Sequence, residues 1–161
     1  MDTLYPPGSG LAAPGLLRSL SGLEFMQRLL SGEIAPPPIA VTLGFRIESV
    51  ERGQVVVASR AGAHAYNPMG TLHGGYAATL LDTCMGGAIH SALKPGQGVV
   101  TLEYKINFMR PMSPKTGLVR GEGRVIHVGR QSGVSEGRLF DSSGKLLAHG
   151  TTTCHIVQMQ E

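Results

Sequence analysis

One stretch of the sequence combines an apolar run with the few residue types that can do chemistry: YNPMGTLHGGYAATLLDTCMGGAIHSAL, residues 66–93. It carries a single carboxylate, Asp82, among Ala, Leu, Gly and Met. An ionised acid among apolar neighbours is costly unless something compensates it. Asp82 is therefore either structural or catalytic. A structural Asp82 would cap a neighbouring backbone or lie at a solvated edge, whereas burial would raise the pKa of a catalytic carboxylate into a range useful for acid–base chemistry.

The loop before the apolar run supplies hydrogen-bond donors. Gly74 and Gly75 open a predicted helix, and glycines at a helix N-terminus leave backbone N–H groups unshielded, with their dipoles directed at an anion or a developing oxyanion. Asn67 and His73 add side-chain donors in the same loop. Each signal alone also has a structural interpretation, such as a tight turn for the glycines or a self-bonded turn for Asn67. The order of these residues is more specific than any one of them.

The elements that must position these groups follow from the periodicity. The run from about residue 75 to residue 91 is apolar or small nearly all round, which predicts a helix enclosed by a sheet. Strand-like runs precede and follow it, at about 41–50, 54–60, 99–108, 117–128, 130–140 and 145–157. The pattern predicts an α+β fold, with a hairpin, one buried central helix and then an antiparallel meander.

The N-terminal part of the chain divides into an arm and a short helix. Residues 1–20 are rich in Pro and Gly, and we expect a flexible arm without an apolar face to bury. Ser21 and Glu24 form a capping-box pattern, which predicts a helix over about residues 22–31. A chain of 161 residues has the length of one domain, and residues 21–161 are expected to form it.

Composition argues against several classes of function. The 14 Lys and Arg are scattered, the net charge is only +3 and aromatics make up 5%, so nucleic-acid binding is poorly supported. The sequence shows no signal peptide and no run long and apolar enough for a membrane span, which favours a cytoplasmic protein. Cys84 and Cys154 form no CxxC motif and are expected to be reduced packing residues. The spacing of His73, Asp82 and His90 matches no common zinc motif, so no metal is expected.

The order of the candidate residues resembles the signature of the PaaI-like acyl-CoA thioesterases of the hotdog-fold superfamily. The matching residues are Asn67, Gly70, His73-Gly74-Gly75, Leu80 and Asp82, followed by VTLEYKINFMRP (100–111), Gly129-Arg130, Asp141, Gly144 and the threonines 151–153. This resemblance covers roughly residues 20–157. It implies a hotdog fold, in which an antiparallel sheet wraps a long central helix, and hydrolysis of a coenzyme A thioester to the free acid and CoA. It implies no cofactor, because coenzyme A is part of the substrate.

The same resemblance implies roles for individual residues. The N–H of Gly74 would polarise the thioester carbonyl, and Asp82 would activate water or attack the carbonyl directly. Asn67 would help to hold the carbonyl or the water, and His73 would support the loop. Thr101 falls where relatives carry a Ser or Thr that helps to position the water.

Coenzyme A brings several phosphate charges, for which Arg is well suited. Arg110 and Arg130 are the candidate substrate-binding side chains, together with the backbone at Gly75. A solvated sheet face is the alternative for each arginine, as it is for three further basic residues on or beside the later strands, Lys105, Arg120 and Arg124. Four residues are candidates for lining an acyl tunnel, with core packing as the alternative: Tyr76, Met85, Met109 and Met112.

Gly74 and Asp82 lie eight residues apart in one helical run, or about 12 Å at roughly 1.5 Å per residue. A scissile carbonyl needs donors about 3 Å from its oxygen and a base equally near its carbon or its water. One chain does not easily place both the donor and the base at the same carbonyl group. Two antiparallel central helices side by side can, with Gly74 of one chain facing Asp82 of the other. We therefore expect a homodimer with shared sites, in line with hotdog proteins, which often pair again into homotetramers.

Two other functions stay open. A non-catalytic acyl-CoA or lipid-binding hotdog module would keep the fold and would work without Asp82. A hotdog hydratase acting on an enoyl-CoA would use an Asp/His pair in another loop motif, which this sequence lacks.

Overall fold

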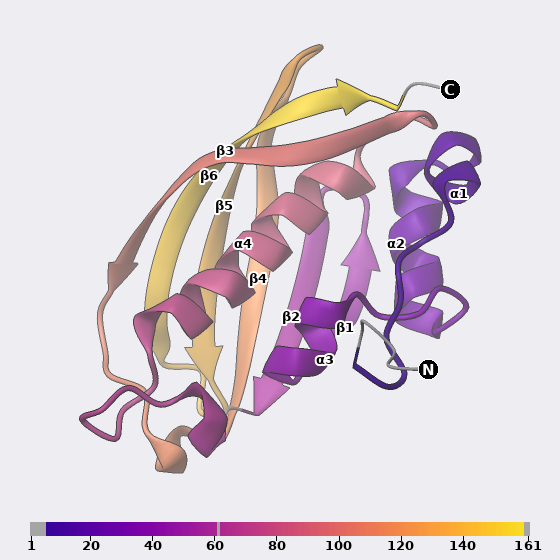
Figure 1. Cartoon of the computed structure of the whole chain (residues 1–161). Helices are drawn as coiled ribbons and strands as arrows, with labels where there is room; N and C mark the ends of the chain where they lie inside the picture. Colours follow the sequence, from indigo (N-terminus) through magenta and orange to yellow (C-terminus); the bar gives the residue numbers. More distant parts are fainter. Residues whose placement is uncertain (1–5, 61, 160–161) are drawn as a thin grey trace.

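The computed structural model describes residues 6–60 and 62–159 (Figure 1). An antiparallel sheet curves around one long helix, α4 (Gly74–Ser91), which crosses its concave face. The six strands of the sheet are, in chain order, β1 (Phe45–Glu51), β2 (Gln54–Arg60), β3 (Gln97–Phe108), β4 (Leu118–Val128), β5 (Ser132–Asp141) and β6 (Leu146–Gln158). The predicted α+β class and the hotdog arrangement are confirmed.

The order of the strands in the sheet is β1-β2-β4-β5-β6-β3, and every neighbouring pair is antiparallel. The predicted hairpin and the meander β4-β5-β6 are present. The expectation that the strand after the helix begins that meander is wrong, because β2 pairs directly with β4. Helix α4 carries the chain across the sheet, so β3 joins β6 at the opposite edge from β1.

Helix α4 has the extent that the apolar run predicts, with its start one residue earlier. Four of its apolar side chains, Leu80, Leu81, Met85 and Ile89, are fully buried. The sheet approaches the helix closely because it carries glycine where the two meet: a Cβ added at Gly123 would overlap the Cys84 carbonyl oxygen. Helix and sheet thus form one layered core, and the burial of apolar surface between them stabilises the fold.

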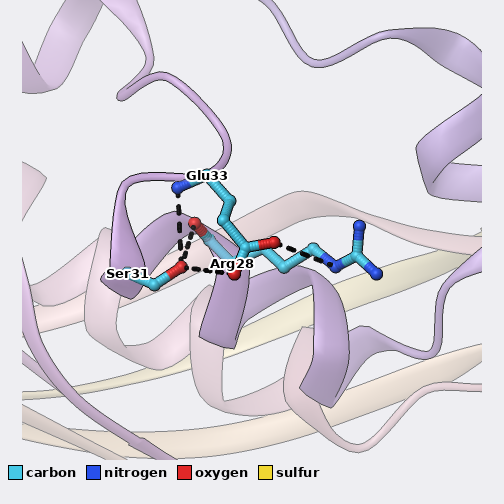
Figure 2. A network of polar contacts seen from close by, with 3 residues as sticks. All are labelled: Arg28, Ser31 and Glu33. Atoms are coloured by element: carbon cyan, nitrogen blue, oxygen red, sulfur yellow. Dashed lines mark hydrogen bonds and ion pairs between the residues drawn. The ribbon is translucent and has the colours of Figure 1, made fainter.

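Helix α2 (Gly22–Ser31) confirms the predicted capping box. The Ser21 hydroxyl accepts a hydrogen bond from the Glu24 N–H, and the Glu24 carboxylate accepts one from the Ser21 N–H. Figure 2 shows the other end of the helix, where the Ser31 hydroxyl donates to the Glu33 carboxylate at 3.1 Å and Arg28 lies 3.8 Å from the same acid. These exposed contacts contribute little energy, and the helix ends at Gly32, which is in the left-handed region at φ 82°.

The first strand starts later than the sequence predicts. Residues 41–43 belong to helix α3 (Pro38–Leu43) and not to a strand. Pro38 occupies the first helical turn, where its missing N–H is not needed. Gly44 then ends the helix in the left-handed region, at φ 67°, and β1 begins at Phe45.

The N-terminal segment contains a short helix, α1 (Pro14–Ser19). Leu16, Leu17 and Leu20 are partly buried and pack against the core. The expectation that residues 1–20 offer no apolar face is therefore wrong for this part. Residues 1–5 lie outside the described residues, and the flexibility of the arm stays a prediction. Two 3₁₀ turns, η1 (Ala63–Ala65) and η2 (Pro114–Thr116), lie in the loops before α4 and β4.

Cys84 and Cys154 are both buried free thiols, as predicted. Burial raises the pKa of each thiol above its ordinary value. Among the described residues, no helix combines the length and hydrophobicity that crossing a membrane requires.

Candidate active site

The loop that precedes α4 is closed on itself. Tyr66 and Leu72 pair as an isolated antiparallel bridge. Inside the loop, the Asn67 Oδ1 accepts hydrogen bonds from the N–H groups of Met69 and Thr71 at 3.0 and 3.1 Å, and its Nδ2 donates to the Thr71 Oγ1 at 2.8 Å. Every side-chain hydrogen bond between Asn67 and a described residue thus lies within its own loop. A contact between Asn67 and a substrate stays a prediction.

The end of this loop presents one free backbone donor. His73 is the N-cap of α4, and its Nδ1 accepts a hydrogen bond from the Gly75 N–H at 2.8 Å. The expectation that both glycine N–H groups are unshielded is therefore wrong for Gly75. Gly74 is exposed at the first helical position, and its N–H has no hydrogen-bond partner among the described residues. The helix start thus directs a single unused donor, on Gly74, toward solvent.

A depression of about 210 Å³ lies beside Gly74. Phe108 forms part of its wall, and its ring would lie 3.5 Å from a Cβ added at Gly74. Arg110 and Met109 line the same depression, and the Arg110 guanidinium donates to the Leu146 carbonyl oxygen. The structure thus brings one of the two candidate arginines next to the candidate oxyanion donor.

Asp82 lies further along α4 and is partly buried. The Thr101 hydroxyl donates a hydrogen bond to its Oδ1 at 2.9 Å, although the two residues lie 19 positions apart in the sequence. No other hydrogen bond to the carboxylate comes from the described residues, so its second oxygen is available. The register of β3 shifts between Thr101 and Glu103, directly after the residue that holds the carboxylate. This bulge, a feature often found beside active sites, carries no signal in the sequence.

The structure therefore contains two separate halves of the candidate site. Gly74 is the first residue of α4 and shares its depression with Arg110, which follows β3. Asp82 lies eight residues further along α4, where Thr101 of β3 donates to it. That separation is about 12 Å along the helix axis. Within one chain, the donor and the carboxylate do not reach the same carbonyl group.

Arg130 is exposed in the turn between β4 and β5, three residues before Gly133. Gly133 pairs with Cys154, and Cys154 pairs in turn with Thr101, so two strand spacings and three residues separate Arg130 from Thr101. No side-chain hydrogen bond or ion pair joins Arg130 to another described residue, and its contact with a substrate stays a prediction.

Other sequence candidates serve the fold. Arg120 donates two hydrogen bonds to Glu48, at 2.5 and 3.0 Å, which hold the pKa of that carboxyl below its usual value. Tyr76, Met85 and Met112 are buried in the core, as the alternative to an acyl tunnel requires. Among the residues that the structure describes, no three His, Cys, Asp or Glu side chains gather into a metal-binding cluster.

Comparisons with known proteins identify the family of this chain. The family model described as the thioesterase superfamily matches residues 69–148, which include Gly74, Asp82 and Thr101. The chain is 32% identical over 115 residues to the 1,4-dihydroxy-2-naphthoyl-CoA hydrolase of Listeria monocytogenes, covering 71% of this chain and 92% of that one. It is 36% identical over 103 residues to the proofreading thioesterase EntH of Klebsiella pneumoniae, covering 64% and 74%.

The fold comparison points the same way. The solved structure of the PaaI protein from the phenylacetic acid degradation operon of E. coli superposes with a TM-score of 0.74 at 25% identity, covering 85% of this chain and 96% of that one. Since both sequence and fold are shared with these enzymes, the chain belongs to the thioesterase superfamily and is a thioester hydrolase.

Proposed function

We propose that this protein hydrolyses acyl-CoA thioesters, with Asp82 as base or nucleophile and the Gly74 N–H as the donor to the thioester carbonyl. The observation that carries the proposal is the hydrogen bond from Thr101 to Asp82, which orients the only carboxylate of α4 and leaves one of its oxygens free. The Listeria relative is named for its action on a CoA thioester, which supports coenzyme A as the thiol.

The proposed reaction uses both halves of the site at one carbonyl group. Asp82 takes a proton from water while the water oxygen bonds to the thioester carbon. The carbonyl electron pair moves onto oxygen, where the Gly74 N–H stabilises the negative charge. When the carbonyl re-forms, the C–S bond breaks and the proton passes to sulfur, which yields the free acid and CoA. A general base supplies about 10²–10⁴ in rate, and one oxyanion donor about 10²–10³.

A nucleophilic Asp82 would give the same products by another route. Its carboxylate would bond to the thioester carbon and expel the CoA thiolate, which forms a mixed anhydride. Water would then cleave the anhydride, and one of its protons would neutralise the thiolate. Both routes need the free Asp82 oxygen and the Gly74 donor at one carbonyl group.

We propose that the working site joins two chains. Val100, Leu102, Tyr104 and Phe108 are 48–64% exposed on β3, the strand that forms one edge of the sheet. Unpaired apolar edges invite pairing with another strand. A two-fold dimer across this edge would lay the α4 helices antiparallel, so that Gly74 of one chain faces Asp82 of the other. A further pairing of dimers into a tetramer is part of the same proposal.

The remaining site residues receive supporting roles in this proposal. His73 and Asn67 hold the loop so that the Gly74 N–H is presented, and Asn67 keeps one amide N–H for the carbonyl or the water. Gly75 keeps the helix start open to the substrate. Arg110 from one chain and Arg130 from the other would bracket the CoA phosphates.

The test is thiol release from a panel of aliphatic and aromatic acyl-CoAs by the parent and by Asp82→Asn. The substitution keeps the shape and removes the base, so we expect turnover to fall by at least about 10²-fold, with folding and assembly unchanged. Glu122→Gln makes the same chemical change at an exposed position of β4 and should keep parental activity.

Asp82→Asn activity within a few-fold of the parent would overturn the role of this carboxylate. If the parent binds acyl-CoA but releases no thiol from any member of the panel, the binding-module alternative is correct.

A further inference from the structure

A cavity of about 500 Å³ lies between α4 and the N-terminal helices. Helices α2 and α3, strand β1 and helix α4 form its walls. Its lining includes Met26, Leu29, Val41, Phe45, Gly86 and Val99. A cavity of this size is within the range that encloses drug-sized ligands, and it is more than twice as large as the depression at Gly74.

Residues that line the cavity neighbour the candidate catalytic carboxylate in the helix and its hydrogen-bond donor in β3. Thr83, which follows Asp82 directly, lines it, and so does Gly86, one helical turn further on. Val99 lines it from β3 and lies two residues before Thr101. Because alternate residues of a strand share one face, Val99 and Thr101 point the same way. The cavity is therefore adjacent to both members of the Asp82–Thr101 pair.

The interior of the cavity is apolar. Met26 and Phe45 present buried hydrocarbon. The Thr83 hydroxyl donates to the Thr79 carbonyl within the helix, so its own hydrogen-bonding capacity is largely used. Arg46 is the charged residue among those that line the cavity, and its side chain is 65% exposed and 3.9 Å from Glu48, which places its charge at the rim.

The far end of the cavity holds one polar ring. His90 stacks on Phe25, with 5.2 Å between the ring centroids. Burial lowers the pKa of His90 below its ordinary value, so its imidazole is neutral near neutral pH. The interior therefore offers a hydrogen-bonding nitrogen but no fixed charge, which suits an uncharged ligand and disfavours an ionised one.

Gly86 keeps the centre of the cavity open. A Cβ built at this position meets no atom within 4 Å. Glycine in a helix interior costs about 1 kcal/mol relative to alanine. The helix therefore carries this cost at a residue that lines the cavity one turn after Asp82, and glycine is the residue that leaves the most room there.

We propose that this cavity receives the acyl group of the thioester and that the wall formed by α2 and α3 sets which acyl groups fit. This inference rests on the proposed function. The class of acyl group is uncharged, apolar and much larger than acetyl, such as a medium-length aliphatic chain or an aryl group of similar bulk. The selective wall lies within residues 26–47, before the segment that the family model matches, residues 69–148. Selectivity would thus come from outside the shared catalytic segment.

The experiment fills the cavity from opposite walls, with Gly86→Phe on α4 and Val41→Phe on α3. For the parent and each variant, kcat/KM is measured with butyryl-CoA and decanoyl-CoA, and affinity is measured for decyl-CoA thioether, which cannot be hydrolysed. We expect the decanoyl-to-butyryl ratio to fall about tenfold or more, because one methylene excluded from an apolar pocket is worth about that much. Ile126→Phe adds the same ring at an exposed position of β4 and should leave the ratio unchanged.

The outcomes separate this inference from the function on which it rests. Equal losses for both chain lengths would place the acyl group elsewhere and overturn it. So would a parental ratio for Val41→Phe combined with dissociated subunits for Gly86→Phe, since a second copy would then occupy this face. If the parent hydrolyses no acyl-CoA, but both variants weaken binding of the thioether and Ile126→Phe does not, the pocket stands and the proposed function fails.

Discussion

Helix α4 presents one long face to the sheet, whereas its open face, the side that carries Gly86, lines the cavity walled by α2 and α3. On the sheet side, a Cβ added at Gly123 would overlap the Cys84 carbonyl oxygen, and one added at Gly133 would lie 2.6 Å from the Ile89 Cγ2. On the other side, a Cβ added at Gly86 meets no atom within 4 Å. Glycine thus allows close packing on one face of the helix and leaves space on the other.

The difference shows how the molecule separates stability from chemistry. Glycine in the strands removes volume so that two backbones approach and the apolar face of α4 is sealed from water. Glycine in the helix leaves volume one turn from Asp82, where none of the described residues fills it. The sealed face is complete within one chain, whereas the open face borders Asp82 and, in our proposal, is completed by a substrate and a second chain.

The largest expected effect comes from breaking the sealed face with Gly123→Ala. The added Cβ meets helix backbone, which cannot rotate away as a side chain would. We expect a loss of more than about 3 kcal/mol of unfolding free energy, the upper end for overpacked cores, measured by urea denaturation. A midpoint equal to that of the parent would show that the sheet and α4 are not packed so tightly.

The next effect concerns the completion of the open face by a second chain. Asp82→Asn and Gly74→Pro damage different halves of the proposed site, so each alone should be nearly inactive. Coexpressed chains should recover up to roughly a quarter of parental activity, because random pairing gives half mixed dimers with one intact site each. Thiol release at equal total protein concentration measures the recovery.

The proline variant is compatible with the local backbone. Position 74 is the first of the helix, where proline is favoured. His73 is extended, at φ −65° and ψ 135°, as a residue before proline must be. Sizing of each single variant is the control for assembly. If both variants are folded and dimeric but their mixture recovers no activity, the site lies within one subunit and the two-chain proposal is wrong.

A smaller effect is expected for Thr101→Val, which removes the hydroxyl that orients Asp82. Hydrogen bonds to charged groups contribute about 1.5–3 kcal/mol, so kcat should fall about tenfold or more while KM changes little. Thr101→Ser keeps the hydroxyl and should restore most of the rate. If valine and serine behave alike, the 2.9 Å contact does not contribute to turnover.

The smallest effect is expected for Gly86→Ala on the open face. Alanine is the better helix former, and its Cβ meets nothing, so the unfolding free energy should rise by about 1 kcal/mol. Thermal and urea denaturation of the parent and the variant measure the change. Destabilisation would mean that this face is filled in the folded protein, and the contrast between the two faces would disappear.

Much of the site was predictable because its signals are local. The apolar run marks α4, and the order from Asn67 to Asp82 marks the loop and the carboxylate. The hydrogen bond from the Gly75 N–H to His73 was missed, although a polar residue directly before a predicted helix is itself a capping signal. Helix α3 was missed because residues 41–50 form one strand-like run in the sequence, yet Pro38 fits the first turn of a helix.

The sequence by itself determined many of the elements and the chemical groups: the capping box at Ser21, the long helix with one carboxylate, and the strands from about residue 99 onward. Short-range periodicity and backbone preferences decide such features. Only the tertiary structure decided that β3 lies beside β6, that Thr101 meets Asp82 and that a cavity opens at Gly86. These features join segments far apart in the chain, and their geometry depends on how α4 crosses the sheet, which no local pattern encodes.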